Sequence, residues 1–254
     1  MKEVYQVLAG MLGQEQRVAQ IANNLANVNT VGFKKDGAMF QDYLAVAARE
    51  AGVGPDAQTS SRPEKVSSWP DLSVSYTDFS MGSLQTTGRP LDVAIEGEEF
   101  FEIKPKNASE TFYTRAGNFT LDAQGGLVTP EGHAVLDENG RAIALNPQLG
   151  TPQITSDGMI RQGGADVARL GLVKFQDPQQ LVKVGDGLFQ APAGVLEATA
   201  TGAQVRSGML EGSNVNAIRE MVDMIETQRA YDVNQKAILA IDDITSKRIE
   251  AAMS

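Results

Sequence analysis

Apolar residues near the start of the chain recur with the spacing of a helix. Within residues 1–30 one apolar position returns every seven residues and others fill the intervening turns: Val4, Leu8, Met11, Val18, Ile21, Leu25 and Val28. This pattern predicts an amphipathic helix. Gly10 and Gly13 lower its intrinsic stability, so we expect the helix to depend on a partner for its order. It should end near residues 27–30, before Gly32.

A second and longer helix is predicted for residues 214–252. No glycine or proline interrupts residues 213–254, and Ser213 or Asn214 can cap the start. Its apolar side chains spread over a broad sector: Ile218, Met221, Val222, Ile225, Tyr231, Ile238, Ile241, Ile244 and Ile249. At about 1.5 Å per residue the helix would be roughly 55–60 Å long. One small β domain cannot cover that length, so its apolar flank needs another helix.

Between the two helices the pattern changes to short apolar runs separated by turn residues. From about residue 84 to 205 the runs are Leu91–Ile95, Phe100–Ile103, Phe112–Thr114, Asn118–Leu121, Leu170–Phe175 and Leu188–Gln190. Turn dipeptides such as Asn139-Gly140 and Asp186-Gly187 lie between them. Strands at this spacing predict an all-β sandwich or open barrel. Residues 45–80 have no clear period, which indicates an extended connector with a short strand around Leu72–Tyr76.

The patterns divide the chain into four segments. Residues 1–44 hold the N-terminal helix and turn, 45–80 the connector, 81–207 the β-rich domain, and 208–254 the C-terminal helix. The predicted fold class is α+β, in which the N- and C-terminal helices pair as a coiled-coil-like core and the middle forms an all-β domain. Because two helices bury only one seam, the remaining apolar surface favours other subunits. Pattern alone leaves open that both helices fold back onto the β domain.

Charge and composition argue against several classes of protein. The net charge of −10, from 32 acidic and 22 basic residues, argues against nucleic acid as the main partner. Without cysteine, neither a disulfide framework nor a thiolate metal site is available. No apolar run approaches the roughly 20 residues that span a bilayer, so direct membrane insertion is not expected. Met1-Lys2-Glu3 does not open a secretory signal peptide, and these rules alone predict a cytoplasmic protein.

The candidate catalytic residues do not form a site. His133 is the only histidine and lies in a turn. The adjacent carboxylates Glu98-Glu99 and Asp242-Asp243 point in different directions, unlike the pair that flanks a glycosidic bond. Gly163-Gly164 lacks the lysine of a phosphate loop, and no serine lies in a Gly-x-Ser-x-Gly elbow. We therefore expect no enzyme, no catalytic or metal site and no cofactor; a hydrolase of cell-wall sugars is the catalytic rival.

Three ordered motifs resemble those of the flagellar rod and hook protein family. They are Ala22–Lys34 (AlaAsnAsnLeuAlaAsnValAsnThrValGlyPheLys), Gly82–Gly97 together with Tyr113–Phe119, and Glu211–Tyr231. The resemblance covers nearly the whole chain. It departs from the family at Gly97–Phe101, where a second glycine is usual. Length and the opening Met1–Tyr5 are more similar to the proximal rod proteins than to the distal ones.

The resemblance implies a structural subunit of the flagellar basal-body rod, which polymerises through its terminal helices into a torque-transmitting axis. The implied partners are copies of itself, other proximal and distal rod subunits, and the flagellar type III export apparatus. Export through that apparatus would place the chain in the periplasmic rod without a cleaved signal peptide, in place of the cytoplasm. The alternatives are a distal rod or hook-type subunit, or a self-contained α+β periplasmic binding protein.

The residues expected at the assembly interface lie in the helices and their motifs. They are Val4, Leu8, Met11, Val18, Ile21, Asn23, Asn24, Leu25, Asn27, Gly32, Phe33, Asn214, Val215, Ile218, Met221, Val222, Ile225, Gln228, Arg229, Tyr231, Ile238 and Ile241. The asparagines can hydrogen-bond backbone groups at a helix end. Gly32 permits a turn that a Cβ would oppose, and Phe33 can anchor the departing chain. We expect the ends of the isolated subunit to be poorly ordered and to fold on assembly.

Overall fold

The computed structural model describes the backbone of the chain except residues 1, 40–73, 107–109, 196, 200–201 and 254. Side chains are also outside the description at 2–9, 38–39, 74–75, 199 and 241–253. The chain forms two compact units. The helical unit comprises Met1–Leu25, Asp36–Tyr76 and Ala217–Ser254, and the β unit comprises Ala26–Lys35 and Thr77–Asn216. Residues 45–73, which make up most of the predicted connector, lie outside the described residues.

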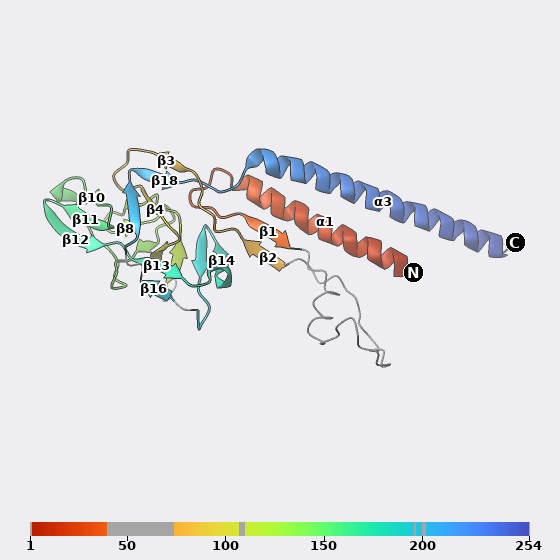
Figure 1. Cartoon of the computed structure of the whole chain (residues 1–254), viewed down its shortest axis with the longest axis horizontal. Coiled ribbons are helices and arrows are strands. Elements are labelled where there is room, and N and C mark those ends of the chain that lie inside the picture. Colours follow the sequence, from red (N-terminus) through yellow and green to blue (C-terminus); the bar gives the residue numbers. More distant parts are fainter. Residues whose placement is uncertain (1, 40–73, 107–109, 196, 200–201, 254) are drawn as a thin grey trace, which may run out of the picture. The chain divides into compact units, whose positions relative to one another are not determined.

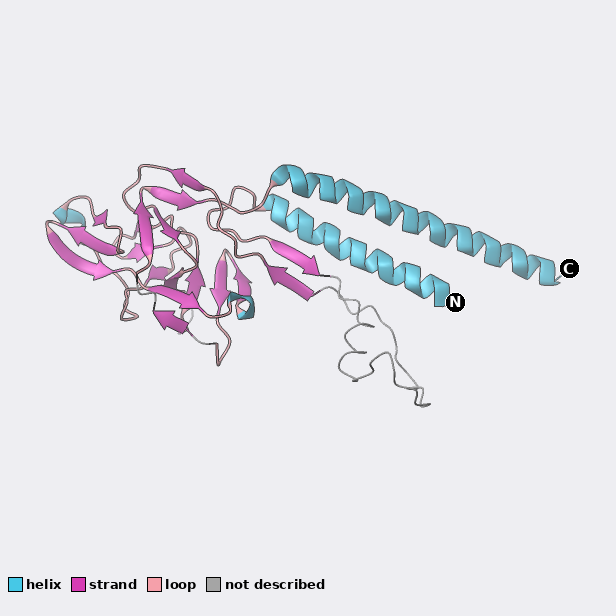
Figure 2. Ribbon diagram, viewed as in Figure 1, coloured by secondary structure: helices cyan, strands magenta, loops and turns pink. Residues whose placement is uncertain are grey.

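The helical unit contains two helices and a short strand pair within its described part. Helix α1 runs from Lys2 to Ala26 and helix α3 from Ala217 to Met253. Figures 1 and 2 show the two helices side by side and antiparallel. Strand β1 (Asp36–Met39) pairs with β2 (Val74–Thr77). The helices predicted at both ends are confirmed, and α1 ends at Ala26, just before the predicted range of residues 27–30.

The β unit is built from short strands joined by tight turns. In chain order they are β3 (Leu84–Thr86), β4 (Val93–Glu96), β5 (Phe100–Lys104), β6 (Phe112–Thr114), β7 (Thr120–Leu121), β8 (Leu127–Val128), β9 (Ala134–Val135), β10 (Gln153–Ile154), β11 (Met159–Gln162), β12 (Ala165–Arg169), β13 (Leu172–Phe175), β14 (Val182–Gly185), β15 (Leu188–Gln190), β16 (Glu197–Thr199), β17 (Gln204–Ser207) and β18 (Met209–Glu211). The 3-10 turns Pro147–Leu149 and Pro178–Gln180 interrupt them. Together with the helices these strands confirm the α+β class in its coarse form.

The largest sheet is antiparallel and centres on β5. Its order is β14-β15-β6-β5-β9-β8-β7, and β13 pairs with both β5 and β16. One edge of β5 carries β6, while the other is shared by β13 at Phe100 and Phe101 and by β9 at Ile103. Strands near the end of the unit pair with strands near its start: β17 pairs with β4, and β18 pairs with β3. The C-terminal side of the β unit therefore completes sheets that begin before residue 97.

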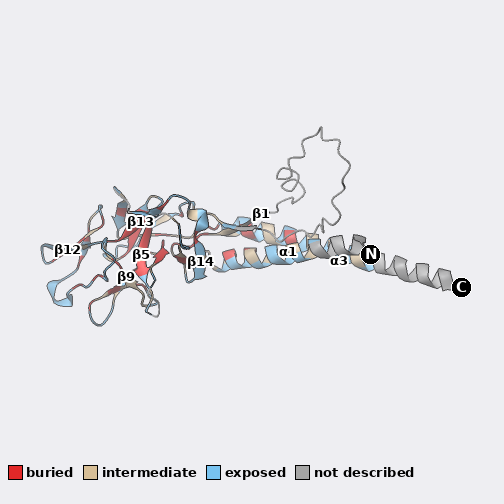
Figure 3. Cartoon of the chain, turned by 90° about the horizontal axis from the view of Figure 1, so that it is seen from below, coloured by how far each residue is buried: buried red, intermediate tan, exposed pale blue. Residues whose placement is uncertain are grey.

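Alternation along β5 sends side chains into two cores, because successive residues of a strand face opposite sides. Phe101 and Ile103 enter the larger core, where the Phe101 ring meets that of Phe119 edge to face at 5.0 Å. Phe100 enters the smaller core with Tyr113 and other aromatic residues. Figure 3 shows the buried residues along β5 and β13. Both faces of the central sheet are thus covered within the unit.

Candidate functional site

The family-like motifs meet in a buried ionic contact within the β unit. Lys34 Nζ lies 2.6 Å from Glu211 Oε1, and neither side chain is more than 1% exposed. Lys34 Nζ also donates to the backbone oxygen of Ser80 at 2.8 Å. The backbone N–H of Gly82 donates to the same Glu211 Oε1 at 2.8 Å. Residues from the first, middle and last motifs are therefore joined through two charged side chains.

Arg115 adds a second cation to this contact. Its Nη1 lies 3.5 Å from Glu211 Oε2 and donates to the backbone oxygen of Gly97 at 2.8 Å. The guanidinium also lies over the Phe100 ring, 4.8 Å from its centroid. Burial lowers the pKa of both Lys34 and Arg115, because removal from water disfavours their charged forms more than Glu211 favours them. Lys34, Arg115 and Glu211 are called the charge cluster below.

Glycines allow the backbone to approach the charge cluster closely. Gly32 has φ +66°, and a Cβ there would lie 2.5 Å from the backbone nitrogen of Ala116. Its N–H donates to the backbone oxygen of Glu211 at 2.8 Å. Beside it, Phe33 is buried, with Lys183 Nζ 4.6 Å from its ring centroid. Gly32 thus has the positive φ of the expected turn, and Phe33, which was expected to anchor the departing chain, is buried.

Asn214 does not cap the C-terminal helix as predicted. Its Oδ1 accepts from the backbone N–H of Lys35 at 2.8 Å, and its Nδ2 donates to the backbone oxygen of Asp78 at 2.7 Å. Ser213 Oγ instead accepts from the N–H of Val215, a buried residue. The cap prediction is wrong because both side chains are engaged before the helix, which begins only at Ala217.

In the helical unit, the side-chain amide of Asn24 also holds the backbone of another segment, as Asn214 does in the β unit. Asn24 is 2% exposed, and its amide exchanges two hydrogen bonds with the backbone of Asp36: Nδ2 to the oxygen at 2.9 Å, and the nitrogen to Oδ1 at 3.0 Å. Nδ2 also lies 3.4 Å from Glu220 Oε2 on α3. The other asparagines of this motif differ, since Asn23 is exposed and Asn27 accepts from the Thr30 hydroxyl at 3.1 Å.

Helix α3 has two contrasting sides along its described part. An outer row of apolar side chains is exposed, from 47% at Met221 to 76% at Ile218; it comprises Ile218, Met221, Val222, Ile225, Val233 and Leu239. On the opposite side an inner row, spaced four and three residues apart, is buried or half-buried; it comprises Glu220, Met224, Thr227, Tyr231, Asn234 and Ile238. The exposed side of α3 thus carries a row of apolar side chains, with exposed charged residues such as Arg229, Asp232 and Lys236 among them.

The expected interface residues divide between these environments. Ile218, Met221, Val222 and Ile225 belong to the outer row, and Gln228 and Arg229 are exposed, whereas Tyr231 and Ile238 belong to the inner row. On α1, Ile21 is buried, while Met11, Val18 and Leu25 are half-buried. The side chains of Val4, Leu8 and Ile241 lie outside the described residues. Leu12, which is 51% exposed, was not among the predicted residues.

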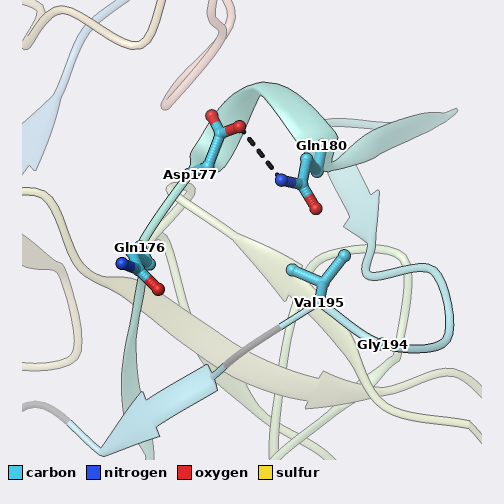
Figure 4. Close-up of a pocket in the computed structure, with 5 residues that line it drawn as sticks. All are labelled: Gln176, Asp177, Gln180, Gly194 and Val195. Atoms are coloured by element: carbon cyan, nitrogen blue, oxygen red, sulfur yellow. Dashed lines mark hydrogen bonds between the residues drawn. The ribbon is translucent and has the colours of Figure 1, made fainter.

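The hollows of the β unit offer little chemistry. One, of about 460 Å³, is lined by Gln176, Asp177, Gln180, Gly194 and Val195 (Figure 4). Its carboxylate already accepts from Gln180 Nε2 at 3.1 Å. Within the described residues no group of three or more histidines or acids is placed to hold a metal ion. Over the same residues, no helix has the length and apolarity that crossing a membrane requires.

Three protein-family models match successive parts of the chain. Residues 9–34 match "Flagella basal body rod protein", residues 94–162 match "Flagellar hook protein FlgE/F/G D1 domain", and residues 206–250 match "Flagellar basal body rod FlgEFG protein C-terminal". The flagellar basal-body rod protein FlgF of Caulobacter vibrioides is 35% identical to the chain, over 91% of the chain and 89% of the relative. The chain belongs to the flagellar basal-body rod protein family.

Relatives of two kinds within this rod family resemble the chain to a similar degree. Rod protein FlgG of Bacillus subtilis is 34% identical over 98% of both chains. Rod protein FlgF of Mesorhizobium japonicum is 34% identical over 90% of the chain and 88% of its own length. The resemblance seen in the motifs is therefore confirmed at the level of the family, with rod proteins FlgF and FlgG both among the relatives.

Each member of the charge cluster falls in a different one of the three family-model matches. Lys34 ends the first match, Arg115 lies within the second and Glu211 within the third. These three residues lie within the motifs that resemble the family, but they were not among the predicted site residues. The burial of Glu220 and Thr227 on α3 was also not predicted. The feature of the sequence that could have indicated the charge cluster is that its charged residues lie inside motifs made mostly of small or apolar residues.

Proposed function

We propose that the chain is a structural subunit of the flagellar basal-body rod, and that it polymerises through its terminal helices to form a torque-transmitting axis. The observation that carries the proposal is the outer row of α3, whose apolar side chains are exposed in the single chain. Fully burying one such side chain contributes about 1.5–3 kcal/mol. Covering the row with helices of other subunits would therefore stabilise the polymer substantially. No catalytic step and no cofactor belong to this function.

The inner row supports a coiled-coil-like pair of α1 and α3 as the unit of assembly. Spacings of four and three residues are those of a heptad seam. The contact of Asn24 with Glu220 joins the end of α1 to the start of α3. A seam that contains Glu220, Thr227 and Asn234 contributes less apolar burial than an aliphatic one, so such a pair would be only modestly stable alone. Packing against neighbours would complete it.

The proposed partners are copies of the chain and other rod subunits, and the proposed location is the rod in the periplasmic space. The names of the relatives, which are basal-body rod proteins, support both. Export through the flagellar type III apparatus is the route consistent with this location. Within the rod we propose the proximal segment, because length and opening residues are more similar to proximal rod proteins. The distal segment is the second candidate, supported by the 98% coverage shared with FlgG of Bacillus subtilis.

The test is a charge placed in the outer row. Ile225→Asp, at a side chain that is 51% exposed, should abolish swimming and rod incorporation while leaving the unfolding of the β unit unchanged. Gln235→Asp is the matched control, because Gln235 is exposed on the same helix but outside the row. Motility is scored in a strain whose own gene is replaced by each variant. Normal swimming with Ile225→Asp would contradict the proposal.

A further inference from the structure

One buried side-chain amide in the helical unit contacts three elements. Asn24 lies near the end of α1 and is 2% exposed. Its Oδ1 accepts from the backbone N–H of Asp36, the first residue of β1, and its Nδ2 donates to the backbone oxygen of the same residue. That Nδ2 also lies 3.4 Å from Oε2 of Glu220, in the first turn of α3. Helix α1, strand β1 and helix α3 therefore meet at one carboxamide.

The two bonds with Asp36 imitate the pairing of neighbouring strands. In an antiparallel ladder, the two residues of a hydrogen-bonded pair exchange both N–H···O bonds, and the backbone groups of successive residues point to opposite sides. The oxygen of Lys35 accepts from the N–H of Asp78, just after β2, so the backbone groups of Asp36 point away from β2. The ladder thus joins β1 to β2, and on the other side of β1 the amide of Asn24 joins this strand pair to α1.

Burial makes the contacts of this amide depend on one another. A side-chain amide can leave water at small cost only if its polar atoms keep hydrogen bonds. The amide of Asn24 obtains two of these bonds from Asp36, while α3 contributes to its burial through Glu220, which is itself 8% exposed. If α3 packed over Asn24 before β1 was in place, Oδ1 would be buried unpaired. An unsatisfied buried polar group of this kind shifts an equilibrium by about 5- to 100-fold.

We propose that Asn24 makes the pairing of α1 with α3 conditional on the docking of β1 against α1. Pairing is favourable once the chain has turned back after α1 and brought Asp36 to the amide, and it is less favourable before. Residues 27–35 form this turn, so the pairing of two helices from opposite ends of the chain is coupled to local folding directly after the first. The inference concerns the helical unit alone and holds whether or not the chain polymerises.

A double-mutant cycle read by hydrogen exchange measures this coupling. Gly37→Val loosens β1, because a Cβ at this position would lie 2.4 Å from the ring of Tyr76 on β2. Asn24→Leu/Glu220→Leu replaces the polar contact by apolar side chains, which can be buried without partners. The full-length chain is studied as a dilute monomer with each change alone and with both together. Mass spectrometry follows amides 221–227 of α3, and the amides of β5 report whether the β unit stays folded.

The perturbation of β1 has its own checks. Faster exchange of the β1 and β2 amides verifies that Gly37→Val loosens the strand pair. Asp36→Pro, which removes the N–H that donates to Asn24 Oδ1, is the second perturbation and must give the same pattern on α3. Asn23→Leu is the matched control for the apolar background, because Asn23 is the neighbouring asparagine and is exposed.

The proposal predicts a response of α3 that depends on Asn24. In the parental chain and with Asn23→Leu, either perturbation of β1 should speed exchange of the α3 amides by about 5- to 100-fold, with β5 unchanged. In the Asn24→Leu/Glu220→Leu background the α3 amides should keep their protection and no longer respond. An α3 that ignores both perturbations in the parental chain would overturn the proposal, as would equal responses in both backgrounds or faster exchange of β5. Loss of all α3 protection in the apolar background would also overturn it, because pairing would then require the amide itself.

Discussion

The β unit and helix α3 place their apolar side chains in opposite ways. In the β unit Phe101 and Ile103 have no exposed surface, and the sheet is covered on both faces by side chains of the same unit. On α3 Ile218 is 76% exposed, while Glu220, two residues later, is buried. One region satisfies its hydrophobic surface internally, whereas the other presents it outward. Under the proposed function, stability and association are therefore assigned to different parts of the chain.

This division explains why the two regions should respond differently to substitution. Removing volume from a filled core creates a cavity that the surroundings cannot fully close. Changing an exposed apolar residue leaves the folded monomer almost unaffected, because the residue has few contacts to lose. Substitutions in the β unit should thus change unfolding, and those in the outer row should change association alone.

The largest expected effect is in the main core of the β unit. Phe101→Ala removes a fully buried ring that packs edge to face on Phe119, and should lower the free energy of unfolding by about 3–5 kcal/mol. Val184→Ala, at an exposed position of β14, is the control and should change it by less than about 0.5 kcal/mol. Urea unfolding followed by circular dichroism measures both. A small loss for Phe101→Ala would mean that this core is not tightly packed.

A smaller effect is expected at the turn that brings the first motif to the charge cluster. Gly32→Ala combines a positive φ with a Cβ that would lie 2.5 Å from backbone atoms, and should cost about 2–4 kcal/mol. Gly88→Ala has a similar φ of +72° but open space around the new methyl group, and should cost only about 1 kcal/mol. The difference between the two variants isolates the close approach. Equal costs would show that the approach at Gly32 relaxes without penalty.

The smallest expected effect is a gain of stability at Glu102. Burial, with Glu197 and Asp137 nearby, raises the pKa of its carboxyl above the usual 4.5. The folded chain thus favours the protonated group: the contribution of Glu102 is fully present below pH 4.5 and is lost as pH rises through the raised pKa. Glu102→Gln should therefore raise the free energy of unfolding at pH 7, by less than about 1 kcal/mol because the carboxyl group is partly exposed to solvent. The gain should vanish near pH 4, and a gain that persists there would contradict this account; exposed Glu131→Gln is the control.

Much of the fold follows from local patterns in the sequence. The helices at both ends carry regular apolar spacing, and the strands Phe112–Thr114 and Leu188–Gln190 have the predicted bounds. The charge cluster could not be predicted in this way, because Lys34 and Glu211 are 177 residues apart and no local rule joins them. The sequence also did not predict which face of α3 is buried and which is exposed. Apolar spacing placed Ile218 and Tyr231 in one broad sector, whereas the structure exposes the outer row and covers, wholly or in part, an inner row of mixed polar and apolar residues.

Hydrogen exchange of the full-length chain as a dilute monomer, read by mass spectrometry, tests the central claim most directly. If the β unit is complete in itself and the helices await neighbours, amides of β5 and β6 will exchange only through global unfolding. Amides between Ile218 and Leu239 on α3 will exchange orders of magnitude faster. Protection on α3 as strong as that on β5 would contradict the account, because the terminal helices would then already be stabilised within the single chain.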